Sequence, residues 1–130
     1  MEARDDVVRY RLQRAREALE DAHVLANANR WSACMNRLYY ACFYAVSALL
    51  FRDDLSSTKH TGVRSLFNQH FVKTGKVPKV LAQVFNDLFA ERQESDYLDF
   101  VQLEATQVRP LITGAEQLVE HVASLIEGTK

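Results

Sequence analysis

The spacing of the apolar residues constrains the fold of this chain more than any other feature of its sequence. In residues 4–28 apolar side chains recur at alternating steps of four and three, as Val8, Leu12, Ala15, Leu19, Ala22 and Ala26. This spacing is one stripe along an amphipathic helix. The remaining faces of that helix carry a mixed set of charges that we expect in solvent: Arg9, Arg11, Arg14, Arg16, Glu17, Glu20 and Asp21.

Residues 31–51 repeat the spacing and widen it. One stripe consists of Trp31, Met35, Leu38, Cys42, Ala45 and Leu49. An adjoining stripe consists of Tyr39, Phe43, Val46 and Leu50. So wide an apolar arc predicts a central helix that is covered on more than one side. We expect Cys34 and Cys42, eight residues apart in this stretch, to be buried thiols and not a disulfide.

Three further segments show helical spacing, near residues 58–73, 78–94 and 108–125. Residues 56–58 (Ser-Ser-Thr) offer N-caps for the first of them, and Gly75 suits its C-terminal end. A loop is expected near residues 95–100. Pro110 predicts that the last helix is either kinked or begins at about that residue.

The scarcity of turn-forming residues agrees with helices. Four glycines and two prolines leave little material for the tight turns of an all-β fold, and 48% apolar with 25% charged residues is close to the globular average. We therefore expect an all-α fold, an antiparallel up-and-down four-helix bundle with one additional short helix. One domain over residues 1–130 is the expectation for this length.

Charge and motifs exclude several functions. A net charge of -1 argues against binding nucleic acid through bulk charge alone, although a local basic site is compatible with it. The histidines and cysteines lack metal-ligand spacing, so we expect no metal and no cofactor. The chain shows no signal peptide and no apolar segment long enough to span a bilayer, which predicts a cytoplasmic protein without membrane association.

Polar and aromatic side chains share one face of the central segment. Arg37, Tyr40 and Tyr44 are spaced i, i+3 and i+7, so about 100° per residue brings them to one side of a helix. Two interpretations stay open. The arginine packs on a tyrosine ring and only fits the bundle together, or it is the anion-binding group of a polar pocket, because a guanidinium can hold a phosphate by two hydrogen bonds.

Two further groups are candidates for binding. Arg92, Asp96 and Tyr97 follow one another at the end of the fourth segment, where an Arg92–Asp96 surface pair is the plain alternative. Lys59 and His60 stand at the start of the third segment, where a helix N-terminus favours anions. The plain alternative there is an ordinary helix start with a lysine in solvent.

Three strings, taken together, resemble the HEPN family of small helical domains. They are WSACMNRLYYACFYAVSALL, KHTGVRSLFNQHFVKTGKVP and RQESDY, and they occur in this order along nearly the whole chain. The resemblance implies a four- or five-helix bundle that often dimerises. It further implies a metal-independent ribonuclease activity, frequently that of a toxin encoded beside a minimal nucleotidyltransferase antitoxin.

The signature of that family is an arginine followed, after four to six residues, by a histidine on the same helix. Arg37 matches the arginine and Asn36 is its polar neighbour, but Tyr44 stands where the histidine is expected. A tyrosine with an ordinary pKa near 10 is a poor general base at neutral pH, although it can donate a hydrogen bond. We therefore expect a degenerate nuclease motif, with Arg37 and Tyr44 as its catalytic positions.

The interpretation that follows is a HEPN-like module that binds a nucleotide, RNA or a protein partner within a toxin–antitoxin-type pair. Its expected binding residues are Asn36, Arg37, Tyr40, Lys59, His60, Arg92, Asp96 and Tyr97. A homodimer and a nucleotidyltransferase partner are implied by the resemblance. Two alternatives remain: an active metal-independent endoribonuclease toxin, and a non-catalytic adaptor that dimerises through its apolar second helix.

Overall fold

Five α-helices and one π-helical turn make up the chain in a computed structural model. It describes the backbone of residues 2–97 and 103–128 and the side chains of residues 3–92 and 103–128. The elements are α1 (Glu2–Asn27), α2 (Trp31–Arg52), α3 (His60–Phe67), the π-turn η1 (Asn68–Val72), α4 (Lys79–Tyr97) and α5 (Ala105–Ile126). The described residues contain no strand, and the predicted all-α class is confirmed.

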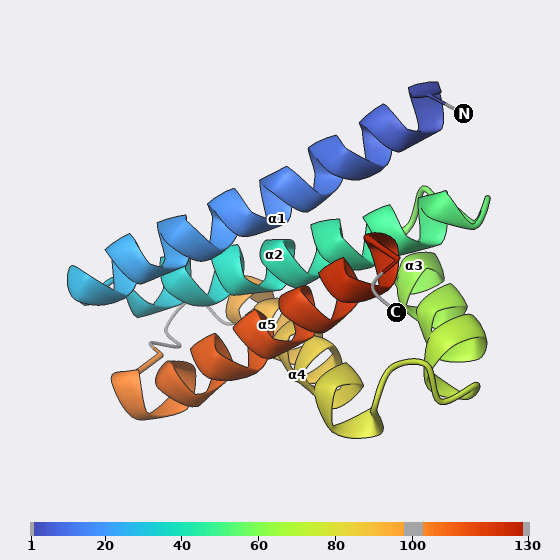
Figure 1. The fold of residues 1–130 in the computed structure, drawn as a ribbon. Coiled ribbons are helices and arrows are strands. Elements are labelled where there is room, and N and C mark those ends of the chain that lie inside the picture. The colour runs from blue at the N-terminus through green and yellow to red at the C-terminus, as the bar shows by residue number, and fades with distance from the viewer. Residues whose placement is uncertain (1, 98–102, 129–130) are drawn as a thin grey trace.

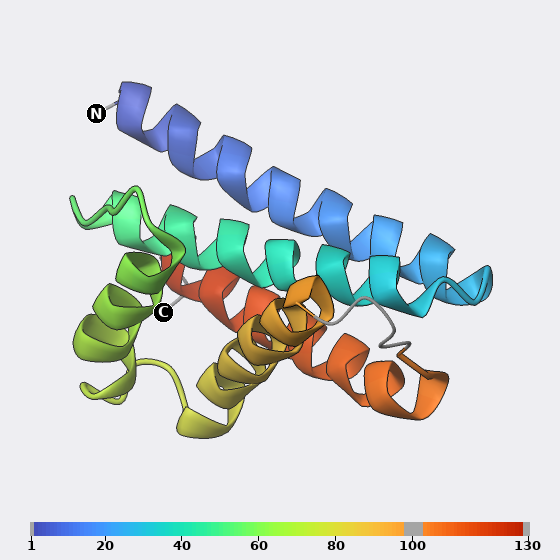
Figure 2. The same ribbon diagram turned by 180° about the vertical axis from the view of Figure 1, so that it is seen from behind.

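The helix α2 is the centre of the bundle. It contacts α1, α3, α4 and α5, as the wide apolar arc of its sequence predicts. The helix α1 runs opposite to α2, and α5 lies beside α2 and runs in the same direction, whereas α4 crosses them at a steep angle (Figures 1 and 2). The short α3 turns away at the C-terminal end of α2. The predicted helical bundle with one additional short helix is therefore observed.

The stripe of α1 packs against α2 as predicted. All six of its members are buried: Val8, Leu12, Ala15, Leu19, Ala22 and Ala26. Half of them are alanines, which keep the two helices close and leave the charged flanks of α1 at the surface. Because Ala15 and Ala22 have no exposed surface at all, any larger residue there would have to displace a neighbouring helix.

The two cysteines of α2 are buried and free, which confirms the prediction of buried thiols. Burial raises the pKa of both thiols, most strongly that of Cys42. Both therefore stay protonated and behave as small apolar side chains. Within the part of the chain that the structure describes, no helix is long and apolar enough to cross a bilayer.

Helix ends account for most differences from the predicted boundaries. The N-cap of α3 is Lys59, one residue after the Ser-Ser-Thr string. The Oγ of Ser57 accepts a hydrogen bond from the Lys59 N–H (3.1 Å) in the turn that precedes the helix. Gly75, with a φ of 80°, follows η1 as predicted for a helix end. The helix α4 continues to Tyr97, beyond the predicted loop start, through a string without glycine or proline.

Pro110 does not mark the beginning of α5. The helix begins at Ala105, where a capping box joins Glu104 and Gln107. Pro110 therefore lies inside the helix and leaves the Thr106 carbonyl without its usual N–H donor four residues later. The alternative that the regular helix starts near the proline is wrong, because the capping box satisfies the backbone N–H groups of an earlier start.

A glycine lets α5 approach α4. A Cβ built on Gly114 would lie 2.8 Å from Cγ2 and 3.2 Å from Cγ1 of Val84 on α4. Such distances are shorter than van der Waals contact, so an added methyl group would push the helices apart. The absence of a side chain at Gly114 is thus a packing requirement and not a turn signal.

We predict that Gly114→Ala lowers the free energy of unfolding by about 1 kcal/mol or more, because this overpacking exceeds the gain in helix propensity. In a Val84→Ala background the same change is expected to be neutral or stabilising, because the methyl group then has room. Urea denaturation of the four chains of this cycle measures the coupling. Additive effects of the two substitutions would contradict the proposed contact.

Candidate functional site

Tyr39 joins three helices beneath the candidate site. Its side chain is fully buried on α2, and its ring stacks on His60 of α3 (centroids 5.7 Å apart) and on Phe85 of α4 (5.8 Å). Its hydroxyl lies 2.6 Å from Nδ1 of His60. A buried phenol needs such a partner, and this one ties the start of α3 to α2.

The protonation of this pair follows from burial. Burial raises the pKa of Tyr39 to about 12, although Arg92 opposes the shift, so the phenol keeps its proton and can donate it to Nδ1 of His60. Burial, and after it the charge of Arg92, lowers the pKa of His60. We therefore assign a neutral imidazole with its proton on Nε2. Stacking on Phe43 at 4.2 Å holds the orientation of the ring.

Two arginines from different helices lie near the ring of Tyr40. The guanidinium carbon of Arg37, one turn earlier on α2, lies 5.3 Å from the centre of the Tyr40 ring, and that of Arg92 on α4 lies 5.2 Å from it. Nη2 of Arg92 also donates a hydrogen bond to the Tyr40 hydroxyl (3.1 Å). These distances fall within the range of cation–π attraction.

Tyr44 and His60 complete the group around Tyr40. Their ring centres lie 5.8 Å and 6.1 Å from that of Tyr40. We call Arg37, Tyr40, Tyr44, His60 and Arg92 the arginine–tyrosine cluster. All five side chains are partly exposed, so solvent and a ligand can reach them.

The far side of Tyr44 meets α1. Nη2 of Arg14 donates to the Tyr44 hydroxyl (3.3 Å), and Nη1 of Arg14 donates to the Tyr10 hydroxyl (3.1 Å). Arg37 and Tyr44 line a cavity of about 310 Å³ between α1 and α2, together with Arg14, Glu17 and other residues of α1. Arg14 is thus shared between the cluster and the surface of α1.

The cluster offers anion binding more readily than proton transfer. Two guanidinium groups near one ring can hold a phosphate by charge-assisted hydrogen bonds. The phenol of Tyr44 can donate a hydrogen bond to it. Among the cluster residues only His60 has an ordinary pKa near neutrality, and its Nδ1 is engaged with Tyr39. Among the described residues, no three His, Cys, Asp or Glu side chains are grouped to hold a metal ion.

Five of the expected site residues lie together, and these are the five of the cluster. Asn36 and Lys59 are exposed beside it, and within the described residues no hydrogen bond or ion pair links their side chains to it. Asp96 and Tyr97 lie in the last turn of α4, but their side chains are outside the described part of the chain.

The contribution of α1 to the site is not among the residues that the sequence predicts. The sequence predicts Arg14 among the solvent-facing charges, yet its guanidinium donates a hydrogen bond to the Tyr44 hydroxyl across the helix interface. The available signal was Tyr10 four residues before it, a spacing that brings a phenol and a guanidinium together on one helix face. The sequence alone does not indicate which helix packs against the face of α1 that carries Tyr10 and Arg14.

Comparison with known proteins identifies the family. The HEPN domain profile matches residues 8–125. A UPF0332 protein of Thermotoga maritima is 42% identical over 130 residues, which is 100% of this chain and 98% of its own. A Methanocaldococcus jannaschii protein, whose name describes it as a candidate toxin, is 29% identical over 101 residues, 78% of this chain and 69% of its own. A UPF0332 protein of Gloeobacter violaceus is 35% identical over 86 residues, 66% of this chain and 68% of its own.

The lowered pKa of His60 predicts a loss of stability in mild acid. Below the ordinary histidine pKa of 6.5 the unfolded chain takes up a proton at this position, whereas the folded chain, in which the pKa is lowered, takes it up only at lower pH. The free energy of unfolding therefore falls as the pH drops from 7.5 to 5.5. In His60→Gln this fall is expected to be smaller.

Urea denaturation followed by circular dichroism at several pH values measures both slopes. His23→Gln is the matched control, because His23 pairs with Glu116 on the exposed side of α1 and α5. Parallel slopes for wild type and His60→Gln would contradict the assigned neutral state.

Proposed function

The chain belongs to the HEPN domain family, and from this premise we propose that it binds the phosphate groups of single-stranded RNA at the arginine–tyrosine cluster, without efficient cleavage, as part of a toxin–antitoxin-type pair. The toxin-related role is supported by the relative whose name describes it as a candidate toxin. The binding role is supported by the chemistry of the cluster.

One observation carries the proposal. Arg37 and Arg92, from different helices, lie 5.3 Å and 5.2 Å from the centre of the same tyrosine ring. Among the described side chains Arg37 makes no ion pair, so its guanidinium can offer its N–H groups to a ligand. Phosphate is the anion that suits such paired guanidinium groups.

The proposed lack of efficient cleavage rests on Tyr44. This tyrosine occupies the position at which the family motif has a histidine, and its hydroxyl accepts a hydrogen bond from Arg14. Arg14 is a protonated guanidinium and cannot accept a proton from the phenol. Tyr44 can therefore bind a phosphate oxygen but is poorly suited to take a proton from a ribose hydroxyl at neutral pH.

A second candidate function has one observation in its favour. His60 belongs to the cluster, and its pKa is lowered, so a neutral imidazole stands 6.1 Å from the Tyr40 ring. If Nε2 of His60 served as the proton carrier in place of the absent motif histidine, the protein would be a metal-independent endoribonuclease. The geometry favours binding over this alternative because Nδ1 of His60 is engaged with the Tyr39 hydroxyl, so Nε2 carries the ring proton and has no free lone pair with which to take one from a ribose hydroxyl.

The partners belong to the same proposal. We infer a homodimer and an antitoxin of the nucleotidyltransferase class, both by analogy with the family that the chain belongs to. An antitoxin that covered the cluster would compete directly with RNA. The proposal thus gives the pairing a physical basis, since one surface would serve both ligand and inhibitor.

We predict that wild type binds a fluorescein-labelled, unstructured 12-nucleotide RNA in EDTA and that Arg37→Ala and Arg92→Ala each weaken binding about tenfold or more. Loss of a charge-assisted hydrogen bond to phosphate is the reason. The matched control is Arg109→Ala, because Arg109 also lies over an aromatic ring, that of Trp31 at 5.0 Å, but outside the cluster. Fluorescence anisotropy measures the affinities, and equal losses in all three variants would contradict the proposal.

We predict that wild type leaves labelled cellular RNA essentially intact in EDTA and that Tyr44→His gains cleavage, since the substitution restores a group that titrates near neutral pH. Arg37→Ala in the Tyr44→His background is expected to lose the activity again. Cleavage by wild type that disappears in His60→Gln and in Arg37→Ala would instead establish the second candidate function.

A further inference from the structure

We propose that a second nucleotide of the same RNA strand binds in the groove between α1 and α2, on the side of Tyr44 away from Arg92. This inference rests on the proposed function and deepens it, because it names the form of ligand: a single strand with unpaired bases. The groove is separate from the five residues of the cluster except for the shared Tyr44.

The composition of the groove carries the inference. A cavity of about 290 Å³ is lined there by two arginines (Arg11 and Arg14), three aromatic residues (Tyr10, Phe43 and Tyr44) and two serines (Ser47 and Ser57). None of its lining residues is acidic, although Arg14 also pairs with Glu17 on α1 (3.8 Å). Guanidinium groups for phosphate, rings for a base and hydroxyls for a sugar are the groups that a nucleotide requires.

The aromatic part of the groove is ready for stacking. Tyr10 is 58% exposed, unusual for so large a ring. Arg14 keeps its guanidinium carbon 5.1 Å from the centre of the Tyr44 ring and 5.9 Å from that of Tyr10, and it bonds both hydroxyls. The two rings are thus held by a common cation, and a base could stack on the exposed Tyr10 ring at little cost in side-chain entropy.

The basic part of the groove is preorganised as well. Arg11 lies over the Phe51 ring at 4.9 Å and donates to the Ser47 carbonyl (3.5 Å). Among the described residues it has no carboxylate partner, unlike Arg9 and Arg16 on the other flank of α1. Ser57 is fixed by the Lys59 N–H and lies so close to Gly62 that a Cβ there would be 2.1 Å from its Oγ.

The groove continues towards the cluster. Its cavity shares Tyr10, Arg14 and Tyr44 with the cavity of about 310 Å³ that Arg37 lines. A strand held at Arg37 therefore has a path to Arg11 along Tyr10, Arg14 and Tyr44, with Glu17 and Asp21 on the far side of the first cavity. The cavity of about 290 Å³ is at the lower limit for small-molecule pockets, which run from about 300 to 1,000 Å³, and suits one nucleotide better than a folded segment of a protein partner.

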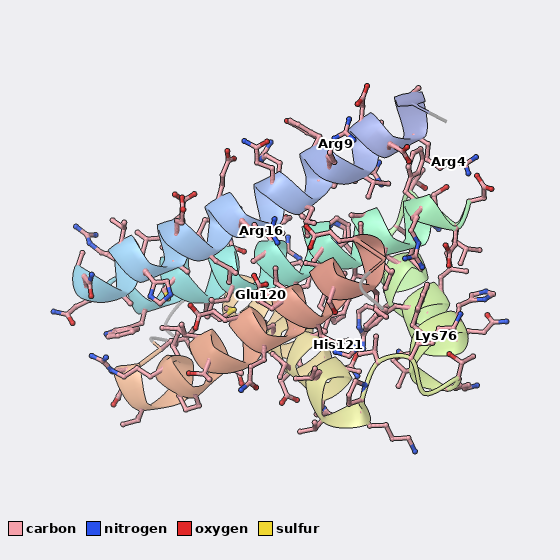
Figure 3. The ribbon with its side chains drawn as sticks, viewed as in Figure 1. Arg4, Arg9, Arg16, Lys76, Glu120 and His121 are labelled. Carbon is pink, nitrogen blue, oxygen red and sulfur yellow. The ribbon has the colours of Figure 1, made fainter. Side chains whose placement is uncertain are left out.

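The test uses the labelled 12-nucleotide RNA and four variants of α1. Tyr10→Ala is expected to weaken binding about fivefold or more, because stacking of one base is lost, whereas Tyr10→Phe keeps the ring and stays within about twofold of wild type. Arg11→Gln is expected to weaken binding and to lower the salt dependence by about one phosphate contact. Arg9→Gln is the matched control, with the same charge change on a side of α1 about 160° away. Figure 3 shows Arg9 and Arg16 on that helix and Arg16 facing Glu120 of α5.

The outcomes separate the two proposals. If Arg37→Ala weakens RNA binding but Tyr10→Ala and Arg11→Gln behave like Arg9→Gln, the groove site is wrong while the proposed function stands. If wild type binds no RNA, both are wrong. Sedimentation velocity accompanies the assay, because a dimer that dissociates in Tyr10→Ala would make the groove a contact between subunits and overturn the inference.

Discussion

The hydrogen bond between the buried Tyr39 phenol and His60 is the interaction on which the rest of the site depends. The phenol cannot be left without a partner inside the bundle, and burial keeps it protonated. The hydrogen bond to the phenol places His60, the first residue of α3, against α2. Phe85 and Phe89 of α4 pack on the ring of Tyr39. The charged side chains of α2 and α4 then meet at Tyr40, one residue further along.

Charge in this protein is organised by aromatic rings more than by ion pairs. Arg37 and Arg92 lie over tyrosine rings and make no ion pair among the described side chains, and Arg14 lies over the Tyr44 ring although it also pairs with Glu17. An aromatic face attracts a cation without neutralising it. A chain with a net charge of -1 can in this way keep a local positive surface for an anionic ligand.

The helices can be predicted from the sequence because burial on one face of a helix gives the apolar residues a helical spacing, and Val8, Leu12 and Ala15 are all buried. Neighbours on one helix face can be predicted too, so Arg37, Tyr40 and Tyr44 lie together as their spacing indicates. The helix partners cannot, because the side chain of Arg14 reaches Tyr44 through a packing arrangement that no local pattern encodes. Pro110 misled because a capping box earlier in the chain outweighs the missing N–H.

The order of the helices along the chain governs how the protein is assembled during synthesis. The hairpin of α1 and α2 leaves the ribosome first and already carries Arg37 and Tyr40, but α4 supplies Arg92 much later, and α5 is the last element to cover the apolar flank of α2. A nascent or truncated chain therefore has half of the cluster and a bare hydrophobic helix. Such a fragment exposes a target for chaperones and proteases before the arginine–tyrosine cluster is complete.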